Sequence, residues 1–236
     1  MKIKSIEILF LFFVAFFLCP LITCCAQNEV ILNTTPKELS EKMIHNPAFI
    51  ENAKGENFCW HARVDMDKYV DNFQLTGNIE WLNAGVTYYD FLIGQMDTDP
   101  DGYKGWIGPY QYDKKYWQDA LVGDAILMAG ILDFCILALE NDSLKKTYGS
   151  KANSYAELIK KSFAEKWDKR GTWYEDGPYG SYTGFNKFLN PANTKKWLSD
   201  SKVNRVGISH PFNKQMECSP GLSQAVQAYQ EYILQG

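Results

Sequence analysis

The positions of apolar residues divide most of the chain into paired helices. The clearest segment is residues 117–140, WQDALVGDAILMAGILDFCILALE, where apolar residues cover nearly the whole circumference of a helix. We expect such a helix to be buried on all sides. Residues 151–169 instead place an apolar stripe, including Tyr155, Phe163 and Trp167, opposite their lysines. That one-sided pattern is typical of an outer helix, so the two segments predict an inner helix followed by an outer one.

A similar pair of helices is predicted earlier in the chain. Residues 60–74 fit one helix and residues 77–96 a second, while the aromatic, Gly-rich stretches 97–110 and 171–193 contain turn signals and are predicted loops. A further helix is expected to begin near residue 210. No run of alternating strands competes with this pattern. The predicted fold class is therefore all-α, built from helical hairpins that repeat as inner helix, outer helix and long aromatic loop.

The N-terminus has the pattern of a secretory signal peptide. MKIK supplies a positive region, ILFLFFVAFFL an apolar region and LITCCAQ a cleavage zone. The apolar run is too short for a comfortable membrane span. The stretch ending in Thr23-Cys24 resembles a bacterial lipoprotein signal, which would make Cys24 the lipidated residue, and cleavage after Ala26 is the alternative. We therefore expect residues 1–26 to contain a signal that directs export to the periplasm or cell surface. Cleavage before Cys24 would leave a protein anchored to the membrane by a lipid on Cys24, and cleavage after Ala26 would leave one without that anchor.

Composition excludes some classes of function. The 236 residues are 46% hydrophobic and 22% charged, which suits one globular core, and the net charge of −4 gives no support to nucleic-acid binding. Beyond the signal, only Cys59, Cys135 and Cys218 remain, without the spacing of a zinc site or a disulfide framework. We predict neither a metal nor a cofactor. Aromatic residues reach 15%, which a helical core and a sugar-binding cleft would both use.

Exported helical hairpins with aromatic loops resemble the (α/α) toroid enzymes that process polysaccharides, namely the six-hairpin glycosidases and the toroid polysaccharide lyases. The start of the apolar helix, Trp117-Gln118-Asp119, resembles the Trp-x-Asp motif of unsaturated glucuronyl and rhamnogalacturonyl hydrolases. In those families the aspartate is catalytic, so the resemblance implies that role for Asp119. Ala120 departs from the glycine that usually follows, and Met128 lies further along the helix than in those families.

The resemblance also implies how the domain is organised. Residues 27–57 are polar, with one short amphipathic piece at residues 36–44, and are expected to form a tether. Residues 58–236 supply two hairpins and the start of a third, which corresponds to part of an (α/α) toroid. An incomplete toroid exposes the apolar faces of its inner helices, so we expect a homo-oligomer or poor solubility.

Toroid geometry would gather the candidate site residues at one rim, because successive inner helices begin on the same side. The guanidinium of Arg63 suits the carboxylate of a uronic acid or a sulfated sugar. His61 and His210 are candidate bases for the acidic proton beside that carboxylate. An ion pair between Arg63 and Asp67 is the structural alternative. Substrate contacts, with a tyrosine as candidate acid, are predicted at Trp60, Trp117, Tyr110, Tyr112, Tyr182, Asn213 and Gln215.

Together these residues predict degradation of an acidic, uronate-containing polysaccharide such as ulvan or alginate by β-elimination. Hydrolysis of uronyl oligosaccharides is the first alternative, with Asp119 as the acid and Asp65, Asp124 or Glu217 as its partner. Non-catalytic glycan binding is the second alternative. A charge inside an apolar helix is costly, so Asp124 is expected to be hydrogen-bonded and structural. The acidic run at 97–102 lacks the later glutamate of an EF-hand loop and is predicted to be a solvated turn.

Overall fold

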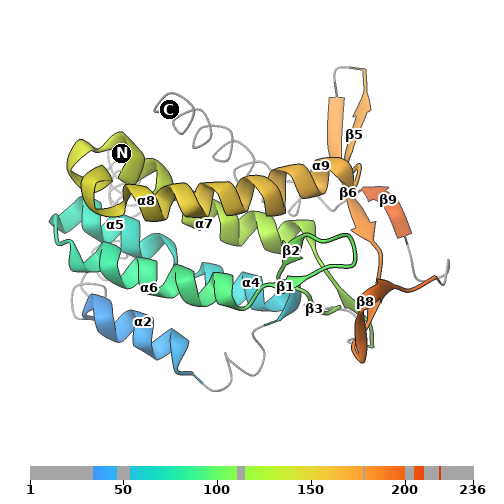
Figure 1. The fold of residues 1–236 in the computed structure, drawn as a ribbon, viewed down its shortest axis with the longest axis horizontal. Coiled ribbons are helices and arrows are strands. Elements are labelled where there is room, and N and C mark those ends of the chain that lie inside the picture. The colour runs from blue at the N-terminus through green and yellow to red at the C-terminus, as the bar shows by residue number, and fades with distance from the viewer. Residues whose placement is uncertain are drawn as a thin grey trace, which may run out of the picture.

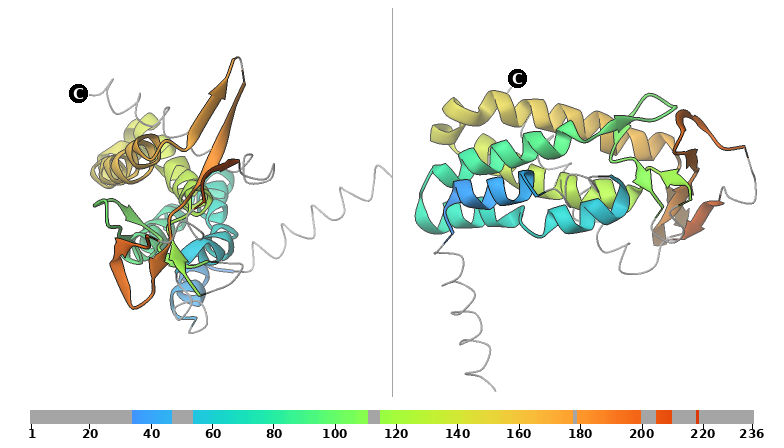
Figure 2. Two further views of the ribbon diagram at one scale, coloured as in Figure 1. Left: turned by 90° about the vertical axis from the view of Figure 1, so that its right-hand side faces the viewer. Right: turned by 90° about the horizontal axis from the view of Figure 1, so that it is seen from below.

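The computed structural model describes residues 34–46, 54–110, 115–177, 179–199, 205–209 and 218. Helices run side by side along the long axis of the molecule, and short strands gather at one end of them (Figures 1 and 2). The helices are α2 (Pro36–Ile44), α4 (Gly55–Arg63), α5 (Asp67–Thr76), α6 (Glu80–Gly94), α7 (Leu121–Glu140), α8 (Asp142–Ile159), the π-helix η1 (Lys160–Glu165) and α9 (Lys166–Lys169).

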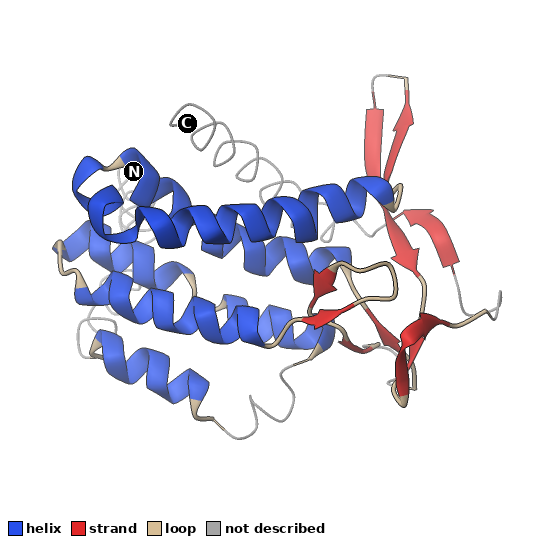
Figure 3. Cartoon of the chain, in the orientation of Figure 1, coloured by secondary structure: helices blue, strands red, loops and turns tan. Residues whose placement is uncertain are grey.

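The strands form antiparallel sheets at the end that we call the β end (Figure 3). The described sheets have the orders β1–β2, β3–β4–β7–β8 and β5–β6–β9. The strands are β1 (Asp97–Thr98), β2 (Lys104–Gly105), β3 (Gly108–Pro109), β4 (Trp117–Gln118), β5 (Trp173–Asp176), β6 (Tyr179–Asn186), β7 (Leu189–Asn190), β8 (Asn193–Trp197) and β9 (Arg205–Ser209).

The apolar helix α7 forms the centre of the core, as its sequence predicts. Two glycines let it approach α4 and the turn before α5. A Cβ on Gly123 would lie 3.1 Å from the sulfur of Cys59, and one on Gly130 would lie 3.0 Å from Met66. Gly123 and Gly130 are seven positions apart, and so are the residues that they contact, Cys59 and Met66. The two segments therefore run in parallel from the β end. By length and composition α7 passes for a membrane-spanning helix, but 83% of its most apolar window is buried inside the protein.

The outer helix α8 also matches its prediction. Its buried face packs on α7, and the side chain of Asn141 caps its first turn by accepting from the backbone N–H groups of Ser143 and Leu144 at 3.0 and 3.1 Å. Within the segment expected to be a tether, α2 packs against α6, and its Leu39 and Met43 contact the core.

The predicted all-α fold class is wrong. The stretches expected to be long aromatic loops, residues 97–110 and 171–193, form most of the strands, so the described fold mixes helices with antiparallel sheets. Most of these strands are two to five residues long. A two-residue strand contains no repeat of the apolar-polar alternation that reveals strands in a sequence. An all-α partial toroid therefore does not describe this protein.

Helix boundaries near the candidate residues also differ from the prediction. The expected helix at 60–74 is two helices, α4 and α5, and α4 begins five residues earlier, at Gly55. His61 consequently lies in the last turn of its helix rather than at its start. The helix expected from residue 117 begins at Leu121, because Trp117 pairs with Leu189 in a sheet. Asp119 therefore precedes the helix.

Candidate functional site

The hairpin of β5 and β6 extends away from the helices (Figure 1). It carries two exposed aromatic side chains. Trp173 is 48% exposed and Tyr174 is 58% exposed. Neighbouring residues of a strand point to opposite faces, so the two rings lie on opposite faces of the hairpin. Rings of this size bury a large area when a ligand covers them, which makes the hairpin a candidate binding element.

Trp173 belongs to a small group of side chains on its face of the hairpin. Its cross-strand partner is Tyr182, with ring centroids 4.8 Å apart, and its Nε1 donates to Glu175 Oε1 at 2.9 Å. A Cβ on Gly180 would come within 2.1 Å of an indole carbon, so only glycine lets the indole lie this close to the strand. We call Trp173, Glu175, Gly180 and Tyr182 the aromatic platform.

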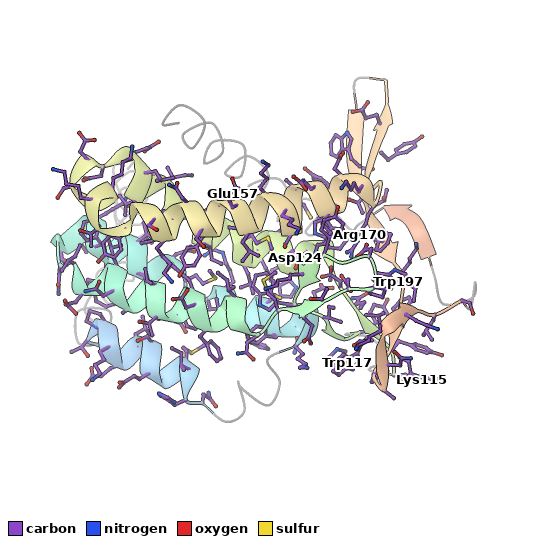
Figure 4. All side chains as sticks on the ribbon, in the orientation of Figure 1. Lys115, Trp117, Asp124, Glu157, Arg170 and Trp197 are labelled. Atoms are coloured by element: carbon purple, nitrogen blue, oxygen red, sulfur yellow. The ribbon has the colours of Figure 1, made fainter. Side chains whose placement is uncertain are left out.

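A buried ionic cluster lies where the helices meet the strands, close to the labelled Asp124 and Arg170 in Figure 4. Arg170 follows α9, and its side chain is only 3% exposed. Its guanidinium donates to Asp99 Oδ2 at 2.7 Å, to Asp119 Oδ2 at 2.8 Å and to both carboxylate oxygens of Asp101 at 2.9 Å. Arg170 thus joins the β1–β2 loop to the residues that precede α7.

Lys166 completes the cluster from the start of α9. Its ammonium lies 2.6 Å from Asp119 Oδ2 and 2.5 Å from Asp124 Oδ2, and it donates to the carbonyl of Lys104 at 2.9 Å. The side chains of Lys166 and Asp119 have no exposed surface. Trp167 adds a hydrogen bond from its Nε1 to Asp124 Oδ2 at 2.9 Å. The π-helix η1 directly precedes Lys166, and π-helical turns often occur at functional positions.

Burial and the neighbouring charges together give the three buried carboxyl groups different pKa values. Burial and the nearby charge of Asp119 raise the pKa of Asp99 to about 9. The same two causes raise the pKa of Asp124 to about 7. Burial also acts to raise the pKa of Asp119, but Lys166, the hydrogen bond with Asp99, and Arg170 outweigh it and lower the value to about 2. At neutral pH, Asp99 therefore keeps a proton and Asp119 is ionised.

The cluster resembles acid–base machinery in its pKa values but not in its accessibility. Separated carboxyl pKa values often mark catalytic pairs. The side chains of Asp99, Asp119 and Asp124 are at most 1% exposed, so no substrate atom reaches them in this structure. An ionised Asp119 also has no proton to give. The geometry therefore gives no support to Asp119, with Asp124 as its partner, as the catalytic acid of a hydrolase.

Several predicted substrate contacts do lie at the β end. Trp117 is partly buried on β4, with the ammonium of Lys54 5.0 Å from its ring centroid. Tyr110 packs edge-on against Phe188 at 5.0 Å. Tyr182 belongs to the aromatic platform. Each of these rings already contacts a neighbouring side chain, and Tyr182 lies beside the exposed Trp173.

The predicted residues of α4 lie apart from that group. Trp60 is partly buried and donates from Nε1 to Glu56 Oε1 at 3.2 Å, while His61 is exposed. Arg63 forms an ion pair with Asp67, the structural alternative that the sequence left open, and Asp65 pairs with Lys68.

Arg63 also borders a cavity of about 530 Å³ between α4, α5 and α7. The cavity is lined by Arg63, Asp67, Val70, Asp71, Gln74, Asp133, Ile136, Leu137 and Glu140. Asp133 lies 12 residues beyond Leu121, where α7 begins, which is about 18 Å along the helix, and Asp119 precedes that start. The structure therefore does not bring Arg63 and Asp119 together.

The remaining predicted residues lie outside the described part of the chain. They are Cys24, Tyr112, His210, Asn213, Gln215 and Glu217. The shared cleft expected for His61 and His210 stays a prediction for this reason. No group of three or more His, Cys, Asp or Glu side chains suited to a metal ion occurs among the described residues.

Sequence reasoning missed the cationic half of the cluster and the exposed aromatic pair. Lys166 and Arg170 follow Phe163 by three and seven positions, which places them on the buried stripe of the outer helix. That spacing was a usable signal, although lysines were expected on the opposite face. Asp99, expected in a solvated turn, is buried. Gly180 and Tyr182 are two positions apart on one strand and therefore share a face, and Trp173 lies opposite Tyr182 on the next strand. Such spacing does not show that the hairpin extends away from the helices.

The chain matches no known protein family, no curated protein and no solved structure. Functional conclusions therefore rest on the residues and their geometry.

Proposed function

We propose that this chain is an exported protein that binds a carbohydrate through the aromatic platform of the β5–β6 hairpin. The observation that carries the proposal is the exposed indole of Trp173, held beside Tyr182 and over Gly180. The C–H faces of a sugar ring pack on such a ring, and its hydroxyl groups bond to nearby polar atoms. Glu175, which already orients the indole, supplies an acceptor at the edge of the platform.

The hairpin suits a long or branched ligand because it extends into solvent (Figure 2). An open platform leaves both ends of a polysaccharide free to continue past it, whereas an enclosed pocket admits only a chain end. Degradation of the bound glycan would need an acid and a base at the platform. Its two ionisable side chains are Glu175, which already accepts from the indole of Trp173, and Tyr182, which packs against the same ring. Glycan binding is therefore the part of the expected activity that this geometry supports best.

Replacement of Trp173 tests the proposal. Trp173→Ala should weaken binding of uronate or neutral oligosaccharides at least about tenfold in isothermal titration, since a buried tryptophan anchor typically contributes 2 kcal/mol or more. Tyr174→Ala is the matched control, because it removes an exposed ring from the opposite face of the same hairpin. Equal affinity in the Trp173→Ala variant and the parent would exclude the platform as the binding site.

A second candidate function is β-elimination at a uronate bound beside Arg63. The cavity of about 530 Å³ is within the size range of small-molecule sites, and Arg63 lines it. Electrostatics oppose this candidate. Arg63 is already paired with Asp67, and Asp71, Asp133 and Glu140 add three more acidic side chains to the lining. An anionic sugar would meet this excess of negative charge, so we place the cavity second.

A further inference from the structure

The β1–β2 loop, residues 97–105, covers the ionic cluster and supplies two of its carboxyl groups. Asp99 and Asp101 both bind the guanidinium of Arg170. The loop has its own tight turn, in which the N–H of Asp99 donates to the carbonyl of Tyr103 at 2.8 Å and Gly102 adopts a φ of 87°. Its backbone contacts with the helices include the carbonyl of Lys104, which accepts from Lys166. The loop is therefore fastened mainly through charged side chains.

The same arginine contacts the sheets of the β end. Its guanidinium carbon lies 4.6 Å from the ring centroid of Phe185 on β6 and 5.7 Å from that of Trp197 on β8. Phe185 is on the strand that carries Tyr182 of the aromatic platform. If the guanidinium of Arg170 moves, its contact with Phe185 therefore transmits the movement to β6, the strand that carries Tyr182.

We propose that the β1–β2 loop is a proton-dependent latch, which docks on Arg170 while Asp99 is protonated and is released when Asp99 ionises. The regulatory half of this inference, in which release weakens glycan binding, rests on the proposed function of the platform. The latch itself does not.

The charges around Asp99 explain why its proton matters. Asp119, which precedes α7, faces it with a negative charge, while Arg170 and Lys166 face it with positive charges. Asp101 of the same loop already accepts hydrogen bonds from the guanidinium of Arg170. The cluster pairs four carboxyl groups, those of Asp99, Asp101, Asp119 and Asp124, with only two cations, Arg170 and Lys166. With Asp101 and Asp119 ionised, a further negative charge on Asp99 would therefore be buried without a matching cation.

The sign of the pH dependence follows from linkage. In the docked loop the pKa of Asp99 is about 9, whereas in a released, solvated loop it returns towards its ordinary value of 3.8. Between those values the docked loop holds a proton that the released loop does not. Rising pH therefore favours release, by up to tenfold in the opening equilibrium for each pH unit, until Asp99 is ionised at about pH 9.

Amide hydrogen exchange of the full chain tests the latch without a ligand. Between about pH 6 and about pH 9, after correction for intrinsic exchange, protection of residues 97–105 should fall by up to tenfold per pH unit. Asp99→Asn keeps a neutral hydrogen-bond donor at this position and should abolish the slope. Asp97→Asn is the matched control, because Asp97 lies in the same loop but pairs with the exposed Lys54. Unchanged protection across this range in the parent protein, or a parent-like slope in Asp99→Asn, would overturn the latch.

Glycan titration at the two ends of the same pH range tests the regulatory half. Affinity should fall with rising pH in the parent and in Asp97→Asn but stay constant in Asp99→Asn. If the loop shows the predicted exchange and no glycan binds at any pH, the latch stands and the proposed function fails. If glycan binds with a pH-independent affinity while the loop opens, the coupling to the platform is wrong.

Discussion

At the scale of single residues, the charges of the ionic cluster are buried and paired. Asp119 Oδ2 accepts from both Lys166 and Arg170, and no part of the Asp119 side chain is exposed. Buried pairs of this kind add little net stability compared with apolar residues of the same size, but removing one partner leaves a charge with no compensation. The cluster is thus a point at which single substitutions have large effects.

Asp119→Asn should therefore lower the free energy of unfolding by about 3–5 kcal/mol, because Lys166 and Arg170 lose a carboxylate that they share. Urea denaturation measures the change. Asp97→Asn breaks an exposed ion pair and should cost less than about 1 kcal/mol. A loss below about 1 kcal/mol for Asp119→Asn would mean that the cluster is not formed as described.

The sequence predicts some of these residues and not others. Asp124 was expected to be structural because a charge inside an apolar helix needs partners, and Lys166 and Trp167 are those partners. The partners themselves could not be predicted, since Asp124 and Lys166 are 42 positions apart and nothing local links them. Asp99 was misjudged for the same reason: a run of aspartates has the composition of a solvated turn until a buried arginine is known to face it.

At the scale of elements, the helices were predictable and the strands were not. The apolar pattern of α7 and the apolar stripe of α8 extend over several turns, so many positions define the helical period in the sequence. Strand β4 has only two residues, and its pairing with β7 depends on a segment about 70 positions away. Tyr110 and Tyr182 were predicted to contact a sugar, but the stretches that contain them, residues 97–110 and 171–193, were predicted to be loops.

The β5–β6 hairpin offers a prediction at this scale. Gly180→Ala should displace the indole of Trp173, because the added Cβ would lie 2.1 Å from an indole carbon. The near-ultraviolet circular dichroism should change, and glycan binding should weaken as in Trp173→Ala. Ser181→Ala, next in sequence and on the other face of the strand, is the control and should change neither. An unaltered spectrum and affinity in Gly180→Ala would show that the ring does not rest on that strand.

At the scale of the whole molecule, the candidate chemistry is divided between two regions. The platform, the ionic cluster and Trp117 lie at the β end, whereas His61 and Arg63 lie near the end of α4, and Arg63 lines the cavity. The sequence expected one shared rim because the start of α4 was placed too late along the chain and the start of α7 too early. The expected homo-oligomer stays a prediction, and its physical reason is weaker than before, since α7 is almost wholly buried in the described fold.

A map of where the ligand binds distinguishes the aromatic platform from the cavity beside Arg63. Amide hydrogen exchange with and without uronate oligosaccharides should show new protection in residues 173–185, which include the aromatic platform, and none in α4, α5 or the second half of α7. Protection confined to the helices around Arg63, with a rise in ultraviolet absorbance from a newly formed conjugated double bond, would contradict the platform and establish elimination at the cavity instead.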